Sequence, residues 1–125
     1  MYYINEKEYV CSVDVTLDIF NDRWKMKIIW FLLEGDKRFK DLHSDIPDIS
    51  QKTLTVKLKE LEKKNIIFRE VFPEVPPKVV YSLSPIGKKL EPVVKEMYEW
   101  GLAYVQEHGE LTAQQSCNPH KKQST

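Results

Sequence analysis

Apolar residues in the first part of the chain recur with the spacing of a helix. Val13, Leu17 and Phe20 stand at i, i+4 and i+7, which places them on one face of a helix. Ser12 precedes them and has a side chain suited to capping a helix N-terminus. We therefore predict a first amphipathic helix after a polar arm, residues 1–10, in which we find no clear period.

A second helix is predicted from Arg23 onward. Asp22 is a good capping residue, and the segment 28–33 (IIWFLL) is apolar on all sides. A helix that is apolar all round belongs in a protein interior. Gly35 is expected to end it.

The next segment has the order of a helix-turn-helix. Phe39, Leu42 and Ile46 mark one side of a short helix, and the dipeptide 47–48 (PD) predicts a turn. Ser50 can cap a longer helix, about 50–64, whose apolar stripe is Leu54, Leu58 and Leu61. A short helix, a tight turn and a longer helix are the parts of a DNA-binding helix-turn-helix.

The pattern changes to that of strands after residue 65. Segments 66–72 (IIFREVF) and 79–83 (VVYSL) are rich in β-branched and aromatic residues, and the proline-rich segment 73–78 separates them. This predicts a hairpin, a wing of about residues 67–83. The fold class is therefore mainly α with a small β-hairpin wing (α+β), a winged helix-turn-helix.

One more helix is predicted after the wing. Ser84 and Pro85 have the residue types of an N-cap and first helical position, Pro92 should kink or split the helix, and Gly109 should end it. Residues 11–109 are thus expected to form the domain, and residues 110–125 a polar, disordered tail.

The outer face of the helix at 50–64 carries the candidate chemistry. Its lysines can reach phosphates or guanine edges, and Gln51 and Thr55 have the donors and acceptors that read bases. Two further basic residues flank the wing loop. The candidate DNA-binding residues are Ser50, Gln51, Lys52, Thr55, Lys59, Lys63, Arg69 and Lys78. The alternative is an ordinary solvated helix face.

Composition narrows the class of protein. The 125 residues fit one domain, and 19 basic against 19 acidic residues exclude a globally basic nucleic-acid binder. The charge is uneven, however: residues 1–22 hold five acidic residues against one basic residue, and residues 50–69 hold six basic against two acidic residues. A neutral total therefore permits a basic patch that a phosphate backbone would attract. With no apolar run long enough for a bilayer, no signal-peptide pattern and two distant cysteines, we expect a cytoplasmic protein.

Four segments carry a resemblance to a known family. They are CSVDVTLDIFNDRWK (11–25), LLEGDKRFKDL (32–42), IPDISQKTLTVKLKELE (46–62) and FPEVPPKVVYSLSPIGKKLEPV (72–93). Together they resemble the HxlR-type, MarR-like family of bacterial winged helix-turn-helix transcriptional regulators, over about residues 11–105. The wing sequence followed by Tyr-Ser-Leu is the most specific part. Lys78 stands where the family often has arginine, and Ser12 where it often has proline.

The resemblance implies a sequence-specific DNA-binding regulator that acts as a homodimer on a near-palindromic operator. It places the N- and C-terminal helices at the dimer interface. The last helix independently has more apolar surface than a small core needs, including Tyr98 and Leu102. Candidate interface residues are Leu17, Met97, Trp100 and Tyr104. The alternative is a long helix that folds back on its own core.

Cys11 is a candidate redox sensor. It precedes the first helix, where the helix dipole favours an anion, although Asp14 opposes a second negative charge nearby. In the family that the chain resembles, a cysteine at this position is a sensor in some members. The alternative is a small buried hydrophobic side chain.

Other functions find little support in the sequence. Cys117 and His120 have a spacing that metal sites use, but a structural zinc needs four ligands, and we expect no metal or cofactor. No P-loop, GxGxxG, HExxH or GxSxG motif occurs, so we expect no enzyme. A winged helix that binds protein without binding DNA stays open as the alternative function. The operator, the effector and the sign of regulation are not encoded in any motif.

Overall fold

Three helices form the centre of the fold in the computed structural model, which describes residues 1–110. They are α2 (Arg23–Leu32), α3 (Phe39–Asp45) and α4 (Gln51–Lys63). The apolar segment of α2 is buried, and so are Leu42 of α3 and the leucine stripe Leu54, Leu58 and Leu61 of α4. The predicted helix-turn-helix is therefore confirmed, with Asp22 and Ser50 as the caps of α2 and α4.

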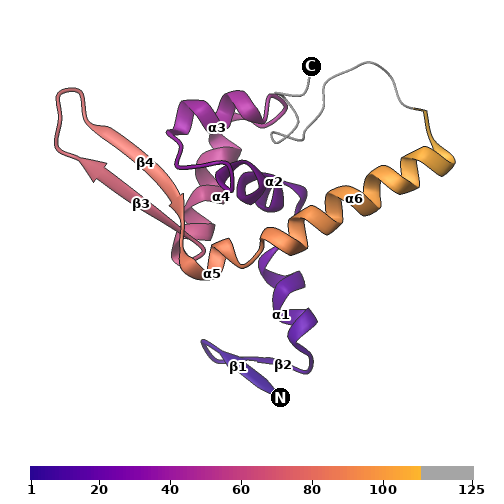
Figure 1. The fold of residues 1–125 in the computed structure, drawn as a ribbon. Helices are drawn as coiled ribbons and strands as arrows, with labels where there is room; N and C mark the ends of the chain where they lie inside the picture. The colour runs from indigo at the N-terminus through magenta and orange to yellow at the C-terminus, as the bar shows by residue number, and fades with distance from the viewer. Residues whose placement is uncertain (111–125) are drawn as a thin grey trace.

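A hairpin follows the three helices and completes a winged helix. Strands β3 (Ile67–Phe72) and β4 (Lys78–Leu83) pair antiparallel, from Ile67 opposite Leu83 to Phe72 opposite Lys78. Ile67 and Leu83 are buried at the base, so the hairpin is anchored in the core while its far end projects (Figure 1). The predicted fold class is confirmed, mainly α with a small β-hairpin wing.

The predicted last helix is split in two. Ser84 caps the short α5 (Pro85–Lys88), and α6 (Glu91–His108) begins with Pro92 in its first turn. Val94 is buried, and the ring of Tyr98 stacks on that of Trp30 at 5.6 Å between centroids. This corrects the sequence interpretation of Tyr98, because it packs against the chain's own core and does not add to the excess apolar surface.

The N-terminal segment forms structure that the sequence did not predict. Strands β1 (Tyr2–Ile4) and β2 (Lys7–Tyr9) form a hairpin, with Asn5 and Glu6 at positive φ as in two-residue type I′ turns. The hairpin is fastened to α1 (Ser12–Ile19) at one carboxylate: the hydroxyl of Tyr9 donates to Asp18 at 2.6 Å, and Lys7 Nζ lies 3.0 Å from it. The hydrogen bond from Tyr9, followed by that from Lys7, lowers the pKa of Asp18.

Two arms extend from this core. Figure 1 shows α1 with its hairpin, and most of α6, projecting away from α2, α3 and α4 on sides that the wing does not cover. No residue of α1 is buried, although an isolated helix of eight residues is unstable in water. The arms are therefore the part of the fold that most needs a partner surface. Among the helices of residues 1–110, none combines the length and apolarity of a membrane span.

Candidate nucleic-acid interface

The start of α4 is built to present its outer face. Ser50 Oγ accepts a hydrogen bond from the Thr53 amide at 3.0 Å, which satisfies one of the free N–H groups at the helix start. The leucine stripe faces the core, so the opposite face is turned to solvent. That face carries an exposed stripe of Lys52, Val56, Lys59 and Lys63.

The lysines of this stripe make no ion pair with any residue of the described range. Of the ion pairs among residues 1–110, none involves Lys52, Lys59 or Lys63. Lys57 differs from them: it points toward α2 and lies 2.9 Å from Asp22 Oδ2. The structure thus separates three available cations on the outer face from one that is engaged inside the molecule.

The two residues predicted to contact bases, Gln51 and Thr55, differ in the hydrogen bonds they can still make. Gln51 is exposed at the first position of α4. Thr55 is half-buried, and its hydroxyl donates to the carbonyl of Gln51 at 2.9 Å. Thr55 therefore keeps acceptor capacity only, whereas the amide of Gln51 can both donate and accept.

The two basic residues of the wing lie at different distances from the wing loop. Lys78 is the first residue of β4, next to the loop, and its Nζ stands 5.2 Å from the centroid of the Phe72 ring. Arg69 is exposed but pairs with Tyr81, midway along the hairpin. The prediction that both flank the loop is wrong for Arg69, because β3 extends to Phe72.

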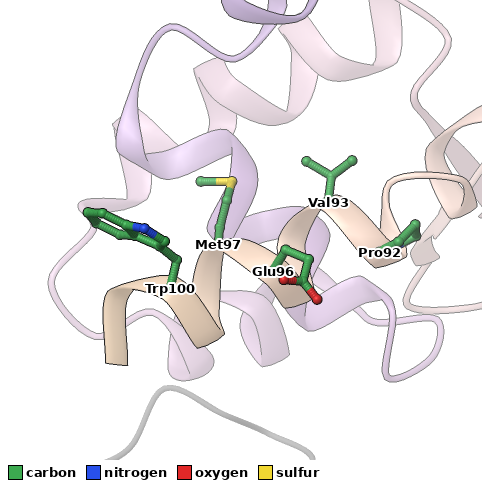
Figure 2. Close-up of a pocket in the computed structure, with 5 residues that line it drawn as sticks. All are labelled: Pro92, Val93, Glu96, Met97 and Trp100. Carbon is green, nitrogen blue, oxygen red and sulfur yellow. The ribbon is translucent and has the colours of Figure 1, made fainter. Parts of the chain in front are cut away.

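A second candidate surface lies on the projecting arms. Pro92, Val93, Glu96, Met97 and Trp100 line an open groove of about 640 Å³, and Figure 2 shows Val93, Met97 and Trp100 rising from successive turns of α6. The aromatic ring of Trp100 stacks on that of Tyr104 at 5.4 Å. The candidate interface residues are all exposed: Leu17 60%, Met97 53%, Trp100 69% and Tyr104 53%. A last helix folded back on its own core would have buried Met97, Trp100 and Tyr104, so that alternative is wrong for these three residues of α6.

Cys11 occupies the boundary between the hairpin and α1. It is the N-cap residue of α1, where Ser12 had been expected, and makes no side-chain capping bond. Cys11 is exposed in the single chain, so it is not buried in the chain's own core. Cys117 and His120 lie outside the described residues, and within residues 1–110 no group of three or more histidine, cysteine or acidic side chains could hold a metal.

One charged cluster was not anticipated from the sequence. Lys25 lies among the apolar residues of α2 and is buried with them, with its Nζ 2.8 Å from Glu60 Oε1 of α4. The available signal was a lysine inside an apolar period, which requires a buried partner. The hydrogen bond that Lys25 donates to Glu60 lowers the pKa of Glu60, and the one that Lys57 donates to Asp22 raises the pKa of Lys57.

Comparison with known proteins supports the winged-helix assignment. The chain is 46% identical over 94 residues to YdeP, an uncharacterized HTH-type transcriptional regulator of Bacillus subtilis, covering 75% of this chain and 73% of that protein. It is 43% identical over 89 residues to the HTH-type transcriptional regulator YodB of Bacillus subtilis, covering 71% and 80%.

Solved structures agree in fold. The redox regulator HypR in its oxidized form superposes with a TM-score of 0.71 at 44% identity, covering 74% of this chain and 96% of that one. The reduced form of YodB from B. subtilis superposes with a TM-score of 0.68 at 38% identity, covering 80% and 98%. The HxlR-like helix-turn-helix family matches residues 19–109. The chain is therefore a member of the HxlR-like family of helix-turn-helix transcriptional regulators.

Proposed function

We propose that the protein is a cytoplasmic regulator that binds double-stranded DNA as a homodimer, with α4 in the major groove and the wing on the backbone. The observation that carries this proposal is the outer face of α4, where three exposed lysines without an ion pair among residues 1–110 accompany an exposed Gln51 at the helix start. In helix-turn-helix proteins the N-terminal residues of the second helix contact base edges. The lysines beside them have the charge and reach to bind phosphates.

The two arms support a dimer. The exposed side chains of Leu17 on α1 and Met97, Trp100 and Tyr104 on α6 form apolar surface that a second copy can cover. A symmetric pair of such arms would hold two α4 helices at fixed separation. The operator is then expected to be near-palindromic, with half-sites about 34 Å apart.

Selection of DNA from a random pool, followed by footprinting on the selected sites, tests the proposal. We expect two protected half-sites that are inverted copies of each other. Binding should weaken steeply with salt because phosphate contacts release counterions. A single unrepeated half-site occupied by a monomer would contradict the dimer. Failure to select any sequence, with salt-insensitive capture of protein, would favour the protein-binding alternative.

Gln51 and the lysines are expected to respond differently to substitution. Gln51→Ala should relax preference at one position of each half-site, at a cost of about 1–3 kcal/mol per mismatched contact. Lys63→Ala should weaken binding to all sequences alike and reduce the salt slope by about one. Both are measured as affinities for the operator and for a scrambled site over a salt series. An unchanged base preference in Gln51→Ala would contradict the assignment of Gln51.

Cys11 is proposed to make the regulator responsive to oxidants or electrophiles. Its thiol is exposed where the hairpin meets α1, beside the proposed dimer surface. Among similar structures, HypR is described as a redox regulator and YodB has been solved after treatment with diamide, which gives the proposal its precedent. An adduct or inter-subunit disulfide at this point would alter the separation of the two α4 helices.

Treatment with diamide is expected to lower operator affinity of the wild type, and excess thiol is expected to restore it. Cys11→Ser should bind the operator normally and lose the response, whereas Cys117→Ser should keep it. Gel shift with parallel mass spectrometry makes the measurement. Unchanged affinity in protein whose Cys11 is shown to be modified would refute the switch.

A further inference from the structure

The buried ammonium group of Lys25 connects α1, α2 and α4. The side chain of Lys25 is 6% exposed, and its Nζ lies 2.8 Å from Glu60 Oε1 of α4 and 3.9 Å from Asp22 Oδ2. It also donates to the carbonyl of Ile19, the last residue of α1, at 3.3 Å. One ammonium group therefore contacts the end of α1, the start of α2 and the last turn of α4.

A second link runs between the same helices with the charges reversed. Asp22 Oδ1 accepts the amides of Trp24 and Lys25 at 2.8 and 3.0 Å, which starts α2. Its Oδ2 lies 2.9 Å from Lys57 Nζ, which holds α4. Because Lys57 and Glu60 are three residues apart on α4, the two links lie about one helical turn apart.

Two directional links of this kind fix the position of α4 along and about its axis, which the leucine stripe does not. Burial of Leu54, Leu58 and Leu61 holds the helix on the core, but hydrophobic burial is non-directional and tolerates sliding or rotation. Ion pairs between partly buried groups contribute little net stability, and their best-attested role is to fix register. Here they restrain α4 along its axis and about it.

We propose that the cluster of Asp22, Lys25, Lys57 and Glu60 positions the recognition helix relative to α1, with Lys25 and Glu60 as positioning residues for DNA reading. The inference rests on the proposed DNA binding. Since Lys25 contacts the end of α1, and α1 lies in the proposed dimer surface, the cluster fixes where each α4 stands with respect to the dimer axis. The spacing of the two half-sites depends on that position.

Loss of the cluster should therefore lower the preference for the operator sequence more than the affinity for DNA in general. In Lys25→Met and in Glu60→Gln we expect operator affinity to fall about tenfold, as for a lost base contact. Affinity for a scrambled site and the salt slope should stay near the wild-type values, because the lysines of the outer stripe are unchanged. Lys25→Arg, which keeps the cation, should retain most of the operator preference. If Lys25→Met does not fold, Glu60→Gln decides, because that side chain is 42% exposed.

Lys37 provides a matched control. Its side chain is also shielded, at 14% exposed, and pairs with Glu34 and Asp45, neither of which is on α4. Lys37→Met should lower thermal stability without changing the ratio of operator to scrambled affinity. A ratio equal to that of the wild type in folded Lys25→Met or Glu60→Gln would overturn the inference.

Hydrogen exchange separates this inference from the proposed function. The amides of α4 should exchange faster in Glu60→Gln than in the wild type, while those of α6 should not change. A wild type without preference for any DNA sequence would refute the proposed function only, and the exchange of α4 would still be informative. Unchanged exchange in α4 would overturn the positioning role.

Discussion

Trp100→Glu is expected to convert the proposed dimer to a folded monomer and to lower operator affinity by about 10²-fold or more, the scale on which linked binding sites exceed single ones. Trp100 is 69% exposed in the single chain, so the substitution removes no intrachain core packing. In the proposed dimer the same position would place a carboxylate in an apolar contact, where an unpaired charge costs several kcal/mol. Sedimentation and circular dichroism measure the two parts of the expectation.

Gln106→Glu is the control for the added charge. It introduces one negative charge on the same helix, at an exposed position about 120° around the axis from Trp100 at 100° per residue. It should leave the dimer and operator affinity unchanged. A Trp100→Glu variant that stays dimeric would move the interface away from α6, and one that unfolds would show that the exposed position of Trp100 is wrong.

The sequence was sufficient for elements whose signal is local. Asp22 and Ser50 were predicted as caps from their residue types, and in the structure their side chains accept hydrogen bonds from amides two or three residues ahead. The leucine stripe of α4 followed from a period that needs no knowledge of its neighbours. The wing was predictable because a proline-rich segment separates two β-branched runs.

Features that depend on distant partners could not be predicted in the same way. The hairpin at residues 2–9 is held by Tyr9 and Lys7 on Asp18, a contact that no local pattern encodes. The role of Tyr98 depends on Trp30, 68 positions earlier in the chain. Lys57 was left out of the candidate DNA-binding residues by its place in the helical period, but its partner Asp22 could not be predicted, because a period does not show which charged group meets that side of the helix.

The second large effect is expected from substitution of Gly87, at the base of the wing. A Cβ on Gly87 would lie 2.3 Å from the carbonyl oxygen of Ile66, far inside van der Waals contact. That oxygen already accepts hydrogen bonds from the amide and hydroxyl of Ser84, at 3.0 and 2.8 Å. The amide of Gly87 in turn donates to Ser84 Oγ at 3.1 Å. The clash therefore cannot be relieved without breaking the contacts that join α5 to the start of β3.

Gly87→Ala is accordingly expected to destabilise the protein by roughly 1–3 kcal/mol, the range of overpacked core substitutions. Gly101→Ala is the matched control, because a Cβ there meets nothing within 4 Å and alanine is favoured over glycine in a helix by up to about 1 kcal/mol. Urea denaturation at one protein concentration compares them, since the stability of a dimer depends on concentration. Because β3 begins at Ile67, one residue beyond the displaced carbonyl, Gly87→Ala should also weaken DNA binding through the wing while Gly101→Ala should not. Equal stability of the two variants would mean that the backbone at Ile66 yields freely, and the close packing of α5 against the base of the wing would not be what holds the wing in place.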